Sequence, residues 1–214
     1  MEFKFDFHVH SNYSHDSKMS LKSIVKKYKK KGFDGIAITD HDTFNGAILA
    51  ERLSEEYGIK IIKGEEVSTE LGDIIGLFLK KEIKSKVFSE AVTEIKGQGG
   101  IVILPHPAMY HVITADVLKE IDAIEVFNSK IGEGANKMAF ELAKKYKKPM
   151  VAGSDAHIPL QIGLCKTVIN SKDKTDKALK KAILSGRIKI EKENISFLRK
   201  VRIKLAIYWG RYVS

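Results

Sequence analysis

Short apolar runs alternate along this chain with segments of helical periodicity, and this alternation constrains the fold more than any other feature. Apolar residues recur at helical spacing over 21–28, 135–146 and 178–183. Ser20 and Gly32 are placed to start and end the first of these helices, and the last is expected to start near Thr175. Alternating strands and helices predict an α/β domain built on a parallel sheet. The predicted strands are Phe3–His10, Gly35–Thr39, Ile59–Lys63, Asp73–Leu79, Ile101–Leu104, Ala123–Phe127, Met150–Ala152 and Thr167–Ile169.

Side chains able to bind metal ions follow these predicted strands, one group after another. Chemistry in a sheet or barrel of this kind gathers at the carboxyl ends of the strands, so we expect these side chains to converge. Imidazole and carboxylate are ligands of Zn²⁺, Mn²⁺ and iron, and the mixture does not choose between these metals. Histidines scattered over a surface would not follow the strands in this way. The residues concerned are His8, His10, His41, Glu65, Glu66, His106, Asn128, Asp155 and His157.

The first predicted strand also indicates where its side chains point. Alternate residues of a strand share a face. Phe3, Phe5, Phe7 and Val9 are therefore expected on a packing face, and Asp6, His8 and His10 on the opposite face. In this interpretation Asp6 orients one of the imidazoles by accepting its free N–H.

Composition excludes some classes of protein and leaves others open. The chain has 214 residues, enough for one undivided domain, and no apolar run is long enough to span a bilayer. No signal segment precedes the first strand, so we expect a cytoplasmic protein. The single cysteine, Cys165, excludes an intrachain disulfide and a cysteine-based zinc site. The net charge of +10 favours phosphorylated or polyanionic partners, although it could also reflect a general lysine bias.

The end of the chain differs from the rest in its charge. From Asn194 to Ser214 there are basic residues and no acidic one, with apolar residues at helical spacing. We predict a domain over 1–190 and a basic C-terminal helix over 191–214 that packs on the domain. Contact of this segment with a membrane surface or an anionic partner is the less favoured alternative.

Taken together, the motifs resemble the PHP superfamily (polymerase and histidinol phosphatase). They are His8-Val9-His10, Ser14 to Asp16, Ile38 to His41, Gly64-Glu65-Glu66, His106-Pro107, Glu125 to Asn128, and Gly153 to His157. Each is weak alone, but their order and spacing are specific, and the resemblance extends from Asp6 to about Ile169. It implies a distorted (β/α)₇ barrel in one domain, with up to three divalent ions (Zn²⁺, Mn²⁺ or Fe²⁺) in its mouth.

The resemblance also implies a ligand set. His8, His10, Glu66 and Asp155 would surround one ion. Glu66 would bridge to a second ion, which His106 also binds. Asp16, His41 and His157 would hold the third.

The sequence leaves the roles of several other residues open. Asn128 is the candidate to complete the second ion, with Glu125 behind it and Asp73 as a less favoured choice. Asp40 is either a structural hydrogen-bond acceptor or a support for the site. Lys130 and Arg187 are interpreted as solvated surface residues in preference to phosphate-binding ones, and His15 and His111 as ordinary polar residues.

The chemistry expected of such a set is the hydrolysis of a phosphate ester. Cations neutralise the charge that makes phosphate esters resist attack, and they lower the pKa of a bound water from about 15.7 towards roughly 7. We therefore expect a phosphoesterase, with His8, His10, Asp16, His41, Glu66, His106, Asp155 and His157 as its working residues, acting on a small phosphorylated metabolite or nucleotide. The alternatives are an exonuclease or oligonucleotide phosphatase acting on nucleic acid ends, and a non-catalytic metal-binding module. The oligomeric state is not predicted.

Overall fold

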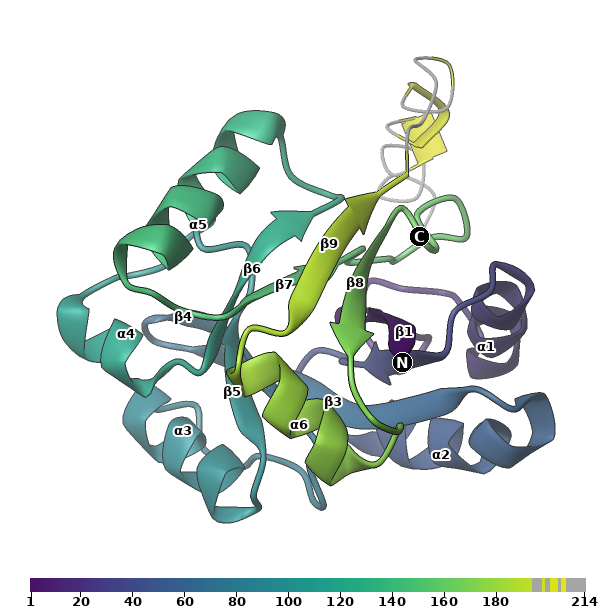
Figure 1. The fold of residues 1–214 in the computed structure, drawn as a ribbon, viewed down its shortest axis with the longest axis horizontal. Helices are drawn as coiled ribbons and strands as arrows, with labels where there is room; N and C mark the ends of the chain where they lie inside the picture. The colour runs from purple at the N-terminus through teal and green to yellow at the C-terminus, as the bar shows by residue number, and fades with distance from the viewer. Residues whose placement is uncertain (194–197, 199–200, 204, 207–214) are drawn as a thin grey trace.

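The computed structural model describes residues 1–193, 198, 201–203, 205 and 206. Residues 1–193 form nine strands and six helices, drawn in Figure 1. The strands are β1 (Glu2–Asp6), β2 (Gly35–Ile38), β3 (Lys60–Thr69), β4 (Gly72–Leu77), β5 (Ile101–Leu104), β6 (Ala123–Asn128), β7 (Met150–Gly153), β8 (Cys165–Asn170) and β9 (Ile188–Lys192). The helices are α1 (Leu21–Lys30), α2 (Asn45–Tyr57), α3 (Phe88–Gly97), α4 (Ala115–Glu120), α5 (Glu133–Lys145) and α6 (Asp176–Leu184).

The strands form one mixed sheet in the order β7-β6-β5-β4-β3-β2-β1-β8-β9. Neighbours from β1 to β3 and from β5 to β7 are parallel, as predicted. The prediction of a wholly parallel sheet was wrong, because β4 runs antiparallel to both β3 and β5, and β8 antiparallel to β1 and β9. The reversal at β4 follows from a tight connection, since two residues between β3 and β4 allow only a hairpin and not a parallel crossover.

The sheet curves until its two halves meet and form a nearly closed barrel. At the carboxyl ends of β1 and β7, Val9 pairs in parallel with Ala156, and the Asp155 N–H donates to the His8 carbonyl at 2.9 Å. Further down, the Thr167 hydroxyl of β8 donates to the Ala152 carbonyl of β7 and accepts its N–H, at 3.2 and 2.8 Å. These contacts confirm the distorted barrel that the sequence predicted.

Two apolar clusters stabilise the barrel. One lies between the strands and the surrounding helices, with Ile24 of α1 and Ile95 of α3 among its members. The other fills the barrel interior and includes Phe5 and Ile62. Apolar residues of α6 join this second cluster, so α6 covers the end of the barrel where the strands begin and leaves the opposite end for the site.

The predicted helix starts are confirmed where a side chain caps the helix. The hydroxyls of Ser20 and Thr175 accept the backbone N–H of Ser23 and Ala178, which otherwise lack partners in the first turn.

The predicted faces of the first strand are partly wrong. Strand pairing stops at Asp6, and the chain is regular again only at the Val9 bridge. Phe5 and Phe7 lie in the interior cluster as expected, but Val9 lies in the outer one. Strict alternation fails because the ladder ends at Asp6, before His8 and His10. His8 and His10 therefore point into the barrel mouth, whereas Asp6 contacts Tyr28 and Ser154 instead.

The last strand, β9, was not predicted, and its pairing with β8 extends to Lys192. The division into a domain over 1–190 and a terminal helix over 191–214 stays a prediction. The packing predicted for the basic segment beyond β9 falls largely outside the described residues. Among the described residues, no helix has the length and apolar character that a membrane crossing requires.

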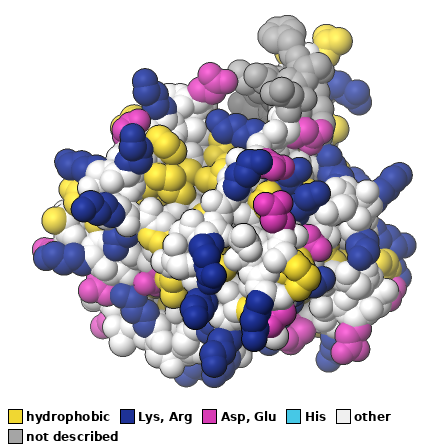
Figure 2. Space-filling model, in the orientation of Figure 1, with side chains coloured by type: hydrophobic (Ala, Val, Ile, Leu, Met, Phe, Trp, Pro, Cys, Tyr) yellow, Lys and Arg dark blue, Asp and Glu magenta, His cyan; other side chains and the backbone are white. Residues whose placement is uncertain are grey.

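The basic side chains do not gather on the face that carries α6. Figure 2 shows lysines and arginines spread over this face among acidic side chains. The net charge of +10 therefore does not form one continuous basic surface there.

Candidate metal centre

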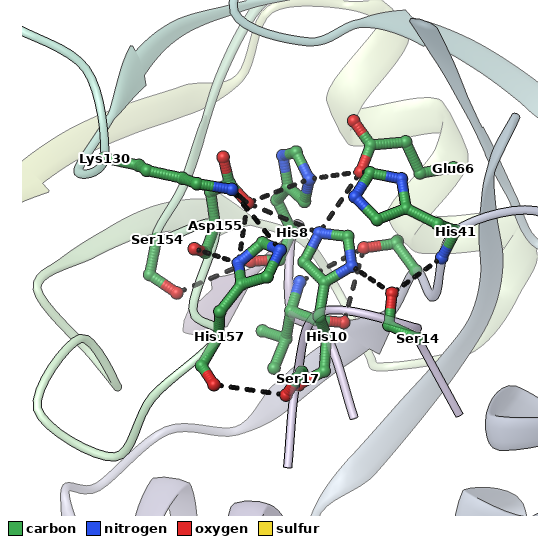
Figure 3. A network of polar contacts seen from close by, with 12 residues as sticks. His8, His10, Ser14, Ser17, His41, Glu66, Lys130, Ser154, Asp155 and His157 are labelled. Atoms are coloured by element: carbon green, nitrogen blue, oxygen red, sulfur yellow. Dashed lines mark hydrogen bonds and ion pairs between the residues drawn. The ribbon is translucent and has the colours of Figure 1, made fainter. Parts of the chain in front are cut away.

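The predicted site residues converge at the barrel mouth. They come from the ends of β1, β2, β5 and β7, from the middle of β3, and from the segment after β1 that contains Asp16. Glu66 does not follow its strand as expected, because β3 continues to Thr69 as one arm of the hairpin with β4. Figure 3 shows His8, His10, His41, Glu66, Asp155 and His157 gathered close together. His8, His10 and Glu66 are fully buried, whereas His41 and Asp16 lie nearer to solvent.

Glu66 is the carboxylate around which the imidazoles gather. Its Oε1 lies 3.0 Å from His106 Nε2, while its Oε2 lies 3.0 Å from His8 Nε2 and 3.2 Å from His10 Nε2. The same oxygen is 3.3 Å from His41 Nδ1. One carboxylate thus faces four histidines with its two oxygens divided between them.

Asp155 is a second carboxylate close to the same ring nitrogens of His8 and His10. Its Oδ1 lies 3.3 Å from His10 Nε2 and from His157 Nδ1, and 3.6 Å from His8 Nε2. His157 Nε2 lies 2.8 Å from Asp16 Oδ2, and His41 Nε2 lies 3.8 Å from the same oxygen.

Three groups of these side chains have the geometry to hold a metal ion, since in each group the potential ligand atoms lie within 4.8 Å of one another. The groups share residues, because His8 and His10 each belong to two of them. They are His8, Glu66 and His106; His8, His10 and Asp155; and His10, Asp16, His41 and His157.

Glu125 contacts two of these histidines, His8 and His106, and supports their positions. Its Oε1 lies 3.1 Å from His8 Nδ1, and its Oε2 accepts the His106 backbone N–H and the Asn128 amide at 2.9 Å each. A carboxylate behind a metal-binding histidine fixes the ring and its tautomer. The sequence prediction gave this role to Asp6 and was wrong. Asp6 instead accepts backbone N–H groups and the Tyr28 hydroxyl.

Asn128 has the contacts of a hydrogen-bond donor. Its amide donates to Glu125 and, at 3.1 Å, to Asp155 Oδ2, while its oxygen accepts the Lys130 N–H. Its role as a metal ligand stays a prediction that these contacts do not support. Asp73 belongs to none of the metal-capable groups among the described residues.

Serine hydroxyls position the other histidines. The Ser14 hydroxyl lies 3.1 Å from His10 Nδ1 and accepts the His41 backbone N–H at 3.0 Å. Asp40 accepts both the N–H and the hydroxyl of Ser11, which is the structural alternative foreseen for it.

Two site residues adopt a backbone conformation that side chains usually avoid. His106 and Asp155 have φ values of 28° and 50°, in the left-handed region. Such conformations cost of order 1–3 kcal/mol and persist only where surrounding contacts enforce them. Glu125 supplies such a contact to the His106 backbone, and the β1–β7 junction supplies one to Asp155.

The charges of the cluster are strongly coupled. Burial alone would raise the pKa of Glu66, but His8, His10 and His106 outweigh burial and hold the pKa well below its ordinary value. The pKa of Asp155 is lowered in the same way, against burial, chiefly by His8. Burial lowers the pKa of His41 and His157, which favours the neutral imidazole that binds metals.

The donor atoms fit divalent ions. His10 Nε2 and His106 Nδ1 are buried without any hydrogen bond, although buried polar groups nearly always have one. His10 Nε2 lies between two carboxylates, and a cation there would satisfy all three groups at once. Oxygen and imidazole donors in this proportion suit Zn²⁺, Mn²⁺ or Fe²⁺.

Three further residues lie near the site. Lys130 is exposed, as predicted, but its Nζ also lies 3.3 Å from His157 Nε2. The rings of His15 and His111 lie 5.3 Å from His41 and 5.6 Å from His106. All three follow strands at the mouth, which was the available signal. Arg187 is exposed and bonds Ser185, as predicted.

A comparison with family models places these observations in a known context. The model of the PHP domain matches residues 6–185, which is most of the chain. The chain belongs to the PHP domain family.

Other proteins share the sequence or the fold. The uncharacterized protein MJ1587 of Methanocaldococcus jannaschii is 37% identical over 164 residues, covering 66% of this chain and 95% of that protein. A two-domain protein of Bacteroides vulgatus containing a predicted PHP-like metal-dependent phosphoesterase has a similar structure, with a TM-score of 0.80 and 21% identity. That match covers 90% of this chain and 65% of the other, and it shows the fold alone.

A shorter match concerns a named nuclease. The 5'-3' exoribonuclease of Haemophilus influenzae is 39% identical over 69 residues, which are 32% of this chain and 25% of that protein.

Proposed function

We propose that this PHP protein is a metal-dependent phosphoric ester hydrolase that acts on a small phosphorylated metabolite or a nucleotide. The observation that supports the proposal is that one carboxylate, Glu66, is shared among four histidines. Glu66 faces His106 with one oxygen and three other histidines with its second oxygen, so it is placed to bridge two cations. Structural sites for single ions do not need such sharing, whereas neighbouring ions that act on one phosphate do.

The proposed ligand sets follow the three groups. His8, His10, Glu66 and Asp155 hold one ion, and Glu66 with His106 holds a second. Asp16, His41 and His157, with His10 close by, hold the third. Bound divalent ions supply such a site with neutralising charge for the phosphoryl oxygens and with water of lowered pKa.

The chain's own residues prepare the site for that chemistry. Glu125 and Ser14 each lie within hydrogen-bond distance of a ring nitrogen of a proposed ligand, so the opposite nitrogen faces the shared carboxylates. Burial of His8, His10 and Glu66 keeps bulk water away, which strengthens their electrostatic attraction for cations and for a substrate anion. Asp16 and His41, which are partly exposed, lie on the side from which a substrate would enter.

The test is turnover with defined metals. The protein, stripped of metal and reloaded with Mn²⁺, Zn²⁺ or Fe²⁺, is assayed on a panel of phosphomonoesters that includes nucleoside monophosphates. We expect release of phosphate in at least one metal form and loss of at least 10³-fold in the His8→Ala/His10→Ala double variant. The exposed Lys137→Met variant serves as a control. Activity retained in the double variant would refute the site.

The match to an exoribonuclease favours one alternative substrate class, the ends of nucleic acids. Short oligonucleotides with 5'- or 3'-phosphates belong in the same panel. Stepwise shortening of these oligonucleotides, with no phosphate released from monoesters, would favour the nuclease. A protein that hydrolyses none of these substrates in any metal form would instead be the non-catalytic metal-binding module.

A further inference from the structure

Lys130 is the basic residue that reaches into the metal centre. It lies two residues beyond β6, and its backbone N–H donates to Asn128 Oδ1 at 2.8 Å, which fixes the start of the loop. Its side chain extends back over the mouth, with Nζ 3.3 Å from His157 Nε2 and 3.7 Å from Asp155 Oδ1 (Figure 3). Among the described residues, no other lysine or arginine has a hydrogen bond or ion pair to the clustered side chains.

The surroundings of Lys130 do not require it as a structural partner. Asp155 already receives the Asn128 amide at 3.1 Å and lies beside His8 and His10. His157 Nε2 has a closer partner in Asp16, at 2.8 Å. The ammonium group has three donors, yet the described contacts give Nζ one hydrogen bond and no carboxylate nearer than 3.7 Å.

The position of Lys130 also differs from that of the metal-binding groups. Its side chain is 29% exposed, whereas those of Asp155 and His157 are 4% and 8% exposed. Divalent ions held by His10, Asp16, His41 and His157 would repel the ammonium group from the bottom of the site and keep it at the rim. A lysine at such a rim is a compact positive charge of the kind that binds phosphate oxygens.

We propose that Lys130 binds the phosphoryl group of the substrate and of the phosphate product at the rim of the metal centre. The inference rests on the proposed phosphoesterase function and adds a residue that contacts substrate without holding metal. The Lys130 ammonium group, opposite the metal ions, would orient the phosphoryl group by attracting oxygens that the ions leave free. The charge of Lys130 therefore affects phosphate binding and not metal binding.

The test compares Lys130→Met, which removes the charge but keeps the chain length, with Lys130→Arg, which keeps the charge. Lys137→Met on the exposed face of α5 is the matched control. Binding of inorganic phosphate to each Mn²⁺-loaded protein is measured by calorimetry, and bound Mn²⁺ by metal analysis. We expect Lys130→Met to bind phosphate about 10- to 100-fold more weakly with unchanged Mn²⁺ content. Lys130→Arg should lie within a few fold of the wild type, and Lys137→Met should match it.

Kinetics separate this proposal from the function on which it rests. With any phosphomonoester that the wild type hydrolyses, Lys130→Met should raise KM more than it lowers kcat. Wild-type phosphate affinity in Lys130→Met, or no phosphate binding by the Mn²⁺-loaded wild type, would overturn the role of Lys130. A changed Mn²⁺ content in Lys130→Met would also overturn it, by showing that the lysine supports the metal centre. A wild type that binds Mn²⁺ and phosphate but hydrolyses no ester contradicts the proposed function alone.

Discussion

At the scale of single residues, the site depends on groups that do not bind metal themselves. Glu125 contacts the His8 ring, the His106 backbone and the Asn128 amide at once, and it is 2% exposed. A single carboxylate thereby sets the direction of one imidazole and the strained backbone of another histidine. Replacement of such a supporting residue at a metal site typically weakens metal binding about 10- to 100-fold.

Replacement of Glu125 by Gln tests this support. The amide nitrogen of Gln must face either His8 Nδ1 or two N–H donors, so it forces the wrong His8 tautomer or leaves donors without an acceptor. We expect about 10- to 100-fold weaker Mn²⁺ binding with the fold retained, measured by competition with a chelating dye. Glu120→Gln, on the exposed surface of α4, is the control. Unchanged affinity in Glu125→Gln would contradict the role of Glu125.

Glu65 has a different effect, on the pH dependence of stability. It is buried on the side of β3 away from Glu66, with one oxygen accepting the Ile83 N–H and the other without a partner. Burial raises the pKa of Glu65 from 4.5 to about 7. The folded state therefore holds a proton that the unfolded state has lost between these pH values, and stability falls as the pH rises through this window.

The variant Glu65→Gln should not lose stability in this way as the pH rises. Urea unfolding at pH 5 and pH 8, with a chelator present, should show the wild type losing on the order of 2 kcal/mol more than the variant. Glu141→Gln, an exposed site in α5, should follow the wild type. Parallel stability profiles for wild type and Glu65→Gln would show that the Glu65 carboxyl titrates normally.

At the scale of elements, the junction of β1 and β7 brings the two halves of the site together. Gly153 ends β7 directly beside His8 and Glu125. A Cβ atom at this position would lie 2.3 Å from His8 Cβ and 2.2 Å from Glu125 Oε1. No side chain fits at such short distances. In a variant with a side chain at position 153, the end of β7 and the adjoining site residues would have to shift.

We therefore expect Gly153→Ala to destabilise the protein by about 1–3 kcal/mol and to weaken Mn²⁺ binding. Gly134, in α5, has open space around its Cα, and Gly134→Ala should stabilise the protein slightly because alanine favours a helix. Thermal unfolding and metal titration of both variants provide the comparison. A Gly153→Ala protein with wild-type stability and affinity would be incompatible with this packing.

The elements also show what the sequence could predict. Helix starts at Ser20 and Thr175 were readable because their caps are local. The clustering of His8, His41 and His106 was readable because parallel strands end at one edge. The reversal of β4, the added strand β9 and the end of strand pairing at Asp6 could not be predicted, because they depend on pairing with distant segments.

Among single residues, Lys130 shows the same limit of sequence reasoning. The residues around Lys130 do not distinguish it from other lysines of the sequence. Only the loop after β6 brings its ammonium group to His157. The support by Glu125 was likewise assigned to Asp6, because local alternation was assumed to continue beyond the last residue of β1. Contacts between side chains on distant strands therefore limit what the sequence alone predicts about a site.

At the scale of the whole molecule, the barrel gathers buried charge that would be unfavourable without counter-ions. Five histidines and the carboxylates Asp16, Glu66 and Asp155 share one mouth, and two ring nitrogens among them lack any hydrogen bond. A fold retains such an arrangement at a cost to its own stability unless bound cations offset that cost. We therefore expect this mouth to bind divalent ions through these side chains.

The most direct measurement is an anomalous difference map from crystals of the protein grown with Mn²⁺ and recorded near the manganese absorption edge. We expect peaks in the barrel mouth, one between His8, Glu66 and His106 and another among His10, Asp16, His41 and His157. Crystals of the His8→Ala/His10→Ala variant should lose these peaks. A wild-type map without any peak in the mouth, at Mn²⁺ concentrations well above those that support turnover, would contradict metal binding by these side chains.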